Sequence, residues 1–367
     1  MKLQLLTILF ICFITPSIHL QAQKLKPNFD KKEYIELLKI AQKTAIDISK
    51  WGNYKTVGDP ERFVLAYRSP SIGLENKWDL WISKDSVATI SIRGTTADAK
   101  SWLANFYAAM VPAKGTLELE KSFIFDYTLS EHPQAAVHVG WLVATAYLSR
   151  DILPKIDSCY KSGIKDFILT GHSQGGGITY LLSSYLSNLK KEHKLPQDIR
   201  FKTYCSAAPK PGNLYYAYTY EYEAREGWAF NVVNTADWVP ETPFSIQTIY
   251  DYNRINIFGS VRSLIKKQPF PSNLVLHHIY NKLNNPGIRA QRNYEEYLGR
   301  VVVKSIKKHL PEFKEPVYYK SNNYVRTGNT IVLFANESYF KVFPDDSPNI
   351  WQHHFVEPYI LLAEEQL

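Results

Sequence analysis

Residues 169–177 read LTGHSQGGG, and this stretch decides how the whole chain is interpreted. It follows a short apolar run and precedes residues 176–189, where apolar side chains recur at helical spacing. Residues 171–175 have the G-x-S-x-G pattern of a serine held on a tight turn between a strand and a helix. Glycines on either side relieve crowding in such a turn. The pattern predicts that Ser173 is a nucleophile; the alternative is a glycine-rich turn without chemistry.

Predicted strands and helices alternate along the rest of the chain. We expect strands at 63–67, 78–82, 87–92, 167–170, 201–205 and 229–233, and helices at 30–50, 136–147 and 176–189. This order predicts an α/β fold with a mostly parallel central sheet flanked by helices on both faces. Residues 246–320 are polar and rich in Lys and Arg, with a helix expected near 293–308; strands at 330–334 and 339–343 and a last helix through residue 362 follow. We therefore expect one domain, residues 23–367, with a helical insertion at 246–320 before the last strands.

A serine needs a base, an orienting carboxylate and donors for the oxyanion before it can attack an ester. On a sheet of this kind the partners follow in the order Ser, Asp or Glu, His. Asp237 comes directly after the predicted strand 229–233, at the end of the strand where loops build such sites. We predict Asp237 as the acid, with Glu241 and Asp251 as alternatives and an exposed turn aspartate as the interpretation without function.

The base must follow the acid in the chain. The histidines in that part are His277, His278, His309, His353 and His354. The first two lie in the insertion and the third ends a lysine-rich helix, so we interpret these three as surface or structural residues. The last two precede the final helix, where a loop histidine can reach the serine. Because adjacent residues cannot both point there, we predict His354 as the base and His353 as the runner-up.

Five stretches in this order resemble the class 3 lipases, the fungal-lipase-like branch of the α/β-hydrolases. They are IRGT at 92–95 with Trp102 behind it, VHVGW at 137–141, TGHSQGG at 170–176, APKPGN at 208–213 and VVNTADWVP at 232–240. The resemblance extends over about residues 60–245 and again over about 323–361. It implies the α/β-hydrolase fold and an ester-hydrolysing activity.

The resemblance also assigns roles to individual positions. Ser173 would be the nucleophile, Asp237 the acid and the terminal histidine the base; a tyrosine follows the family's histidine, and Tyr359 after His354 favours that choice. The elbow geometry makes the backbone N–H of Gln174 one oxyanion donor, and the family match makes Thr95 the other, with its hydroxyl able to assist. His138 falls in a stretch that is usually structural in the family.

Three departures from the family pattern stand out. Ser206-Ala207 and Lys210-Pro211 replace the family's usual residues in a structural stretch. The 117 positions from Asp237 to His354 exceed what the family's core requires, which marks 246–320 as an insertion.

The region between Trp102 and Val137 occupies the place of a lid and contains Phe106, Tyr107, Met110, Val111, Phe123, Ile124, Phe125 and Tyr127. These side chains fit either a mobile apolar flap or ordinary core packing.

Residues 1–22 have the features of a secretory signal peptide, with Lys2 before a short apolar core and the small residue Ala22 at the end. We expect cleavage and export, to a secreted or periplasmic location without a transmembrane segment; an uncleaved anchor is the alternative. Loss of Lys2 lowers the formal net charge from +8 to +7. This charge could favour anionic surfaces, but no dense basic run concentrates it, so we interpret it as aiding solubility. For Cys159 and Cys205 we expect two free or buried thiols rather than a bridge.

Together these features predict a secreted serine hydrolase of carboxylic esters, most simply acylglycerols, that acts through an acyl-enzyme. We expect an ester or lipid substrate, met at a lipid–water interface, and no nucleic-acid partner. No cluster of Cys, His and carboxylate residues has ligand spacing, so we expect neither a metal nor a cofactor. The alternatives are an inactive lipid- or glycan-binding module on the same fold, and an esterase for phospholipid or aromatic esters.

Overall fold

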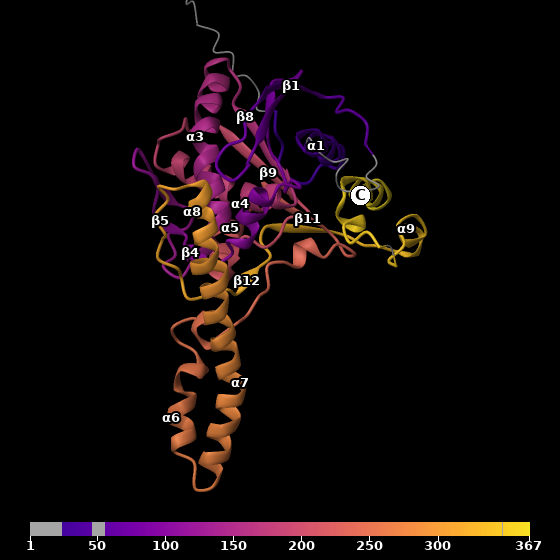
Figure 1. Cartoon of the computed structure of the whole chain (residues 1–367). Helices are drawn as coiled ribbons and strands as arrows, with labels where there is room; N and C mark the ends of the chain where they lie inside the picture. Colours follow the sequence, from indigo (N-terminus) through magenta and orange to yellow (C-terminus); the bar gives the residue numbers. More distant parts are fainter. Residues whose placement is uncertain (1–23, 46–55, 347) are drawn as a thin grey trace, which may run out of the picture.

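The computed structural model describes residues 24–45, 56–346 and 348–367, and a seven-stranded sheet runs through the middle of this part of the chain (Figure 1). In sheet order the strands are β1 (Phe63–Arg68), β2 (Trp78–Ser83), β3 (Val87–Ile92), β8 (Asp166–His172), β9 (Arg200–Ser206), β11 (Ala229–Asn234) and β13 (Asn329–Leu333). The strands β1, β2 and β3 pair antiparallel, whereas β3, β8, β9, β11 and β13 pair parallel. The mostly parallel sheet predicted from the sequence is confirmed.

Helices cover both faces of this sheet. The helices α3 (Val139–Lys161), α4 (Gln174–Lys191) and α5 (Leu214–Glu223) pack on one face, and α1 (Lys31–Thr44) and α10 (Val356–Gln366) pack on the other. Alternate side chains of strand β8 point to opposite faces of the sheet. Phe167 and Leu169 join the core under α3 and α4, while Ile168 joins the core under α1 and α10. Burying each of these side chains contributes about 1.5–3 kcal/mol.

The parallel strands bring three predicted site residues to one edge. Thr95 follows β3, Ser173 follows β8, and Asp237 follows β11. Because parallel strands end at the same edge of a sheet, loops that are far apart in sequence meet there. The fold thus gathers residues from three segments of the chain into one region.

Two smaller sheets and a short helix lie beside the main sheet. They comprise β4 (Met110–Pro112), β7 (Ala136–His138), β10 (Gly212–Asn213) and β12 (Tyr324–Val325) in one sheet, β5 (Lys114–Glu120) and β6 (Phe123–Thr128) in the other, and the helix α2 (Ala99–Phe106). Most of the apolar residues named for a possible lid are buried here, although Phe106 and Ile124 are exposed. Core packing is therefore the better description of the segment 107–137.

The insertion is helical, as predicted. It contains η3 (Ile249–Asp251), η4 (Ile257–Ser260), α6 (Val261–Lys266), α7 (Ser272–Glu295), η5 (Glu296–Val301) and α8 (Val302–His309). Figure 1 shows α6 and α7 as an antiparallel pair that projects away from the sheet, while α8 returns to the body. We call residues 252–294 the helical hairpin.

Two expected elements differ from the structure. The predicted strand 339–343 is instead the helix α9 (Glu337–Val342), because the Asn336 side chain accepts a hydrogen bond from the Tyr339 N–H at 2.9 Å and so caps a helix. The helix expected from 136 begins at Val139, after the strand β7, and runs on to Lys161. His138 caps it by accepting from the Trp141 N–H at 3.3 Å.

The predicted signal peptide, residues 1–22, lies outside the described residues, as does the end of the helix expected at 30–50. No helix within the described ranges is both long and apolar enough to cross a membrane. Cys159 and Cys205 are buried and free, as expected from the sequence.

Candidate active site

Ser173 occupies the tight turn that the sequence predicts. Its backbone has φ 61° and ψ −134°, a conformation that side-chain-bearing residues rarely adopt. A Cβ on Gly171 would overlap the backbone of Gly175, and a Cβ on Gly175 would overlap the carbonyl oxygen of Ile92. Only glycine fits at these two positions, so the G-x-S-x-G spacing follows from the geometry of the turn.

Asp237 and His354 form a buried pair. The Nδ1 of His354 lies 2.8 Å from Asp237 Oδ2, and the other carboxylate oxygen accepts from the Val239 N–H at 3.0 Å. Asp237 ends its turn just before η2 (Val239–Glu241), and His354 ends η6 (Gln352–His354). Since a carboxylate only accepts, Nδ1 carries the proton and Nε2 is left as the basic nitrogen.

Ser173 and His354 line the same cavity. Among the described residues, the side-chain hydrogen bond of His354 is the one from Nδ1 to Asp237, so Nε2 is the nitrogen available to take the serine proton. Contacts between a nucleophile and its base are often long in an unliganded site and shorten when substrate binds. The structure thus places Ser173 and His354 on one cavity, with Asp237 buried behind His354.

The alternative residues have other partners. His353 Nδ1 is 2.8 Å from the Tyr339 hydroxyl, and its Nε2 lies 3.4 Å from Asp345. Asp251 accepts from the Thr248 N–H at 2.7 Å and caps a short helix within the insertion. Glu241 lines the cavity but does not contact His354 in the described hydrogen bonds. The geometry therefore favours Asp237 and His354 over the runner-up residues.

Tyr359 contacts the acid rather than the base. Its hydroxyl donates to Asp237 Oδ2 at 2.8 Å and accepts from the Asn234 N–H at 3.1 Å. Burial raises the pKa of this phenol well above its usual value, so the hydroxyl stays a donor. The tyrosine that the resemblance singled out after His354 thus fixes the orientation of the carboxylate.

Thr95 and Gln174 are placed to stabilise an oxyanion. Gln174 is the first residue of α4, so its N–H has no acceptor within the helix. The Thr95 hydroxyl oxygen accepts from Asn105 Nδ2 at 2.9 Å, which leaves its own proton to donate. Both residues line the same cavity as Ser173. A negatively charged oxygen bound beside Ser173 would meet donors from two different loops.

Asn105 is a site residue that the sequence analysis missed. Its Oδ1 accepts from Gln174 Nε2 at 2.9 Å and from Trp141 Nε1 at 3.1 Å, while its Nδ2 donates to Thr95. The backbone carbonyl of the same residue is 3.2 Å from His138 Nε2. One asparagine on α2 thereby connects both oxyanion candidates to the buried His138–Trp141 stack.

His172 is a second residue that the sequence analysis did not assign. Its Nε2 is 2.6 Å from the backbone oxygen of His354, and its Nδ1 is 3.1 Å from Ser206 Oγ, which lies 2.7 Å from the Tyr34 hydroxyl. A carbonyl oxygen only accepts, so Nε2 donates and Nδ1 accepts from Ser206, which in turn accepts from Tyr34. This chain of hydrogen bonds anchors the loop that carries His354.

The Ser173 cavity has a volume of about 750 Å³, within the range of small-molecule sites. Its walls are largely aromatic, with side chains drawn from several segments: Trp102, Phe106, Trp141, Trp238, Phe244, Tyr294, Trp351 and Phe355. Trp102 packs against Trp351 with ring centroids 5.9 Å apart, and Trp238 packs against Trp351 with ring centroids 4.9 Å apart. Such walls favour an apolar group beside the serine.

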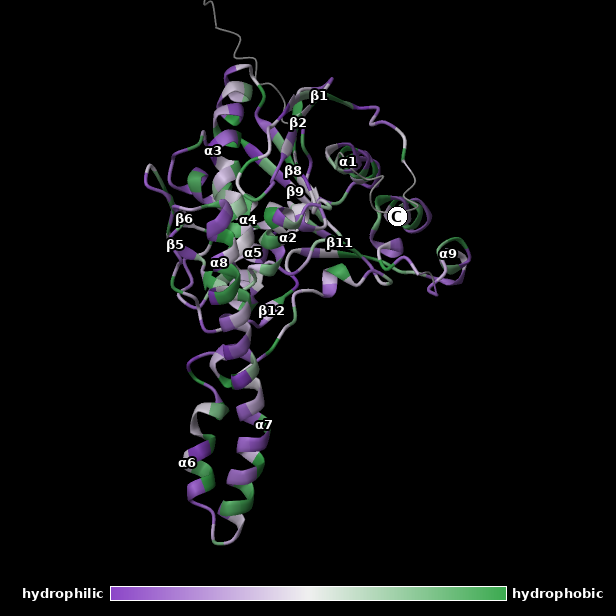
Figure 2. Cartoon of the chain, viewed as in Figure 1, coloured by the Kyte–Doolittle hydropathy of each residue, from purple (hydrophilic) through white to green (hydrophobic). Residues whose placement is uncertain are grey.

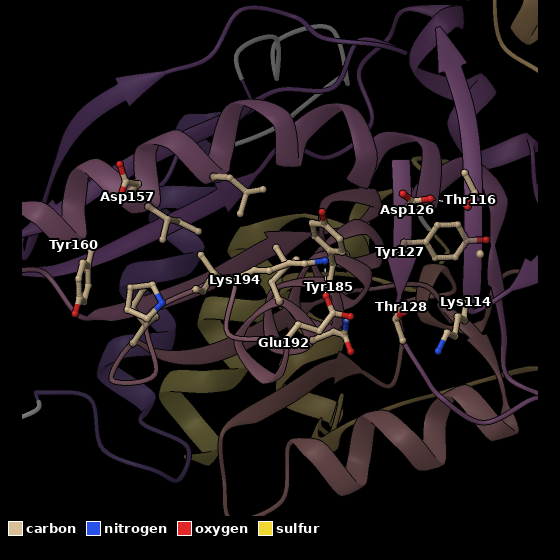
Figure 3. A pocket seen from close by; sticks show the side chains of 18 residues that line it. Lys114, Thr116, Asp126, Tyr127, Thr128, Asp157, Tyr160, Tyr185, Glu192 and Lys194 are labelled. Carbon is tan, nitrogen blue, oxygen red and sulfur yellow. Dashed lines mark hydrogen bonds and ion pairs between the residues drawn. The ribbon is translucent and has the colours of Figure 1, made fainter. Parts of the chain in front are cut away.

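A second cavity, of about 740 Å³, lies between the β5–β6 hairpin and the helices α3 and α4 (Figure 3). Charged side chains such as Lys194 and Glu192, which pair at 2.7 Å, line it together with tyrosines. None of its lining residues is a serine, cysteine or histidine. This cavity therefore has, among its described lining residues, no serine–histidine combination like that of the Ser173 cavity.

Two buried histidines predict a loss of stability in mild acid. Burial lowers the pKa of His138 and of His172 to about 3. The unfolded chain takes up these protons as the pH falls through about 6.5, whereas the folded protein resists them, so acid favours unfolding. We expect the free energy of unfolding to fall by roughly 2 kcal/mol per histidine between pH 7 and pH 5. Chemical denaturation at the two pH values measures this, and His138→Gln should remove about half of the fall; a pH-independent unfolding free energy would contradict it.

Comparisons with known proteins give one family match and several matches to solved structures. A family model described as "Lipase (class 3)" matches residues 89–247. The lipase propeptide complex of Rhizomucor miehei is 17% identical with a TM-score of 0.42, and the match covers 59% of this chain and 65% of that chain, less than two thirds of it. The lipase of Rhizopus microsporus var. chinensis is 21% identical with a TM-score of 0.41, with 58% and 69% covered. A search of curated proteins gave no match.

Proposed function

We propose that this chain, whose residues 89–247 match the class 3 lipase family model, is an exported serine hydrolase that cleaves acylglycerols through an acyl-enzyme on Ser173. The observation that carries this proposal is the hydrogen-bonded pair Asp237–His354 on the cavity that holds Ser173. A binding module with a degenerate site would have no need of this pair. Export rests on the signal-like residues 1–22, which lie outside the described residues.

In the proposed reaction Ser173 Oγ forms a bond to the ester carbonyl carbon while its proton passes to His354 Nε2. The carbonyl electron pair moves to the oxygen, where the N–H of Gln174 and the N–H and hydroxyl of Thr95 donate to it. Asp237 holds the imidazole in the required tautomer and stabilises its positive charge. The C–O bond then breaks, the leaving alcohol takes the proton from His354, and the acyl group stays on Ser173.

Water completes the cycle. It gives a proton to His354 Nε2 and attacks the acyl carbon, and the oxyanion forms again at the same donors. When this second intermediate breaks down, the carboxylic acid leaves and Ser173 regains its proton. The chain's own groups supply each proton transfer in this scheme.

The aromatic walls of the cavity support a long apolar acyl group as the substrate's acid part. Each CH₂ group buried contributes about 0.8 kcal/mol, which corresponds to roughly a four-fold gain in kcat/KM until the cavity is filled. We expect kcat/KM for p-nitrophenyl esters to rise from acetate to at least octanoate, and emulsified triacylglycerols to be hydrolysed. Activity restricted to phospholipids or to aromatic acid esters would replace the acylglycerol assignment, and no activity from folded protein would favour a binding module.

A further inference from the structure

The helical hairpin carries nearly all of the chain's excess positive charge. Residues 252–294 contain no Asp or Glu, but they contain Arg254, Arg262, Lys266, Lys267, Lys282, Arg289 and Arg292. These seven charges compare with a formal net charge of +8 for the whole chain. All seven side chains are exposed, and none makes an ion pair with any residue that the structure describes. Their charge is therefore left uncompensated on one projecting element.

The same hairpin exposes many large apolar side chains. They are Ile255, Ile257, Phe258, Leu264, Phe270, Leu274, Val275, Leu276, Ile279 and Leu283. Phe270 in the turn between α6 and α7 is 78% exposed, and Leu283 on α7 is also 78% exposed. In the described hairpin only Ile265 is a buried large apolar residue. Figure 2 shows hydrophobic and hydrophilic segments alternating along both helices.

A lipid surface with anionic headgroups complements this combination of basic and apolar side chains. Basic side chains interact with the headgroups while apolar side chains enter the boundary between headgroups and acyl chains. The charges run from Arg254 to Arg292, and the exposed apolar residues run from Ile255 to Leu283. Because both kinds of residue are spread along the hairpin rather than gathered at its turn, contact along its length buries more of them than contact at the tip.

The base of the hairpin adjoins the Ser173 cavity. Tyr294, at the end of α7, and Leu298, in η5, line that cavity. On the other side of the insertion, Phe244 also lines it and is 83% exposed. The base of the hairpin therefore forms part of the wall of the Ser173 cavity.

We propose that the helical hairpin docks along an anionic lipid surface and so holds the Ser173 cavity at that surface. This inference deepens the proposed function and rests on it for the identity of the substrate, because it names the surface where a lipid ester would be met. Vesicle binding itself does not require chemistry at Ser173. The two proposals can therefore fail separately.

The test is co-sedimentation of full-length Ser173→Ala protein, which leaves the vesicles intact, with vesicles of phosphatidylcholine alone or with phosphatidylglycerol added. We expect binding to the anionic vesicles, weakened when the ionic strength rises from about 0.05 M to about 0.5 M. Replacing three hairpin charges, Lys266→Gln, Lys267→Gln and Lys282→Gln, should lower that binding by roughly ten- to a hundred-fold. The matched control removes three exposed charges from the body, Lys84→Gln, Lys121→Gln and Lys341→Gln, and should bind as before.

Equal binding to neutral and anionic vesicles, or equal loss in both triple variants, would overturn the proposal. Concentration-dependent self-association that the hairpin variant loses, without a change in vesicle binding, would identify a second copy of the chain as the partner instead. Hydrolysis of a soluble short-chain p-nitrophenyl ester by the wild-type protein is measured alongside. If ester hydrolysis is present while vesicle binding is absent, the hairpin inference fails and the proposed function stands. If vesicle binding is present while ester hydrolysis is absent, only the proposed function is rejected.

Discussion

Ser173→Ala is expected to lower kcat/KM for ester hydrolysis by a factor of about 10⁴ or more, with the protein still folded. The substitution removes the atom that bonds to the acyl carbon and leaves the oxyanion donors and the cavity in place. Alanine keeps the Cβ that the turn at φ 61° already accommodates, so the backbone needs no change. Steady-state hydrolysis of p-nitrophenyl octanoate by the purified variant measures the effect.

A covalent probe separates loss of the nucleophile from loss of binding. A fluorophosphonate should label the wild-type protein once and the Ser173→Ala variant not at all. Ser158→Ala, at an exposed position on α3 that does not line the Ser173 cavity, is the matched control and should keep both labelling and activity. Full activity in Ser173→Ala would reject the serine mechanism.

Asp237→Asn should lower kcat by a factor of about 10³ to 10⁴ while leaving KM nearly unchanged. Oδ2 accepts from both His354 and Tyr359, and Oδ1 accepts from the Val239 N–H. An amide nitrogen at either position faces a donor, so one set of bonds is lost in either orientation. The negative charge that stabilises the imidazolium is lost in both cases.

A parallel pair of histidine variants checks that the effect comes from the base. His354→Ala should be at least as inactive as Asp237→Asn, because it removes the base itself, whereas Asp237→Asn leaves the base in the wrong tautomer. His353→Ala should keep most of the activity, since that ring contacts Tyr339 and Asp345 rather than the cavity. Activity lost in His353→Ala and kept in His354→Ala would reverse the assignment of the base.

The predicted core of the site followed from the sequence because strong local constraints are visible there. The turn at Ser173 admits only glycine at Gly171 and Gly175, on either side of the serine, and this requirement produces the G-x-S-x-G motif. Parallel strands end at one edge, so a strand followed by Asp237 places that residue near the serine. The resemblance to a family supported the choice of His354 over His353, because the two adjacent histidines are alike in local pattern.

Other residues of the site are not marked by a local sequence motif. Asn105 contributes through hydrogen bonds to residues 10, 36 and 69 positions away in the chain. His172 holds a loop 182 positions away through a single hydrogen bond to a backbone oxygen. Contacts of this kind depend on the three-dimensional arrangement of helices and strands, and no periodicity of side chains reports them.

Two sequence patterns, the composition of residues 339–343 and the distribution of positive charge, gave incomplete information. Residues 339–343 have strand-like composition, but the cap at Asn336 and the packing of Tyr339 and Phe343 make the segment helical. The positive charge was interpreted as aiding solubility because no dense basic run was found. The proposed lipid contact rests on the absence of acidic residues from 252 to 294, which a search for basic clusters does not detect.

The two ends of the insertion meet where it leaves and rejoins the body. Ile246 pairs with Asn322, and the Ser245 hydroxyl donates to the Tyr324 carbonyl at 2.7 Å. When the two ends of an insertion are held together, the chain entropy lost on closing it grows only with the logarithm of its length. The projecting part can therefore be shortened, extended or exchanged while Asp237 before it and His354 after it keep their places. Protein engineering can use this junction to graft a different targeting element onto the same hydrolase frame.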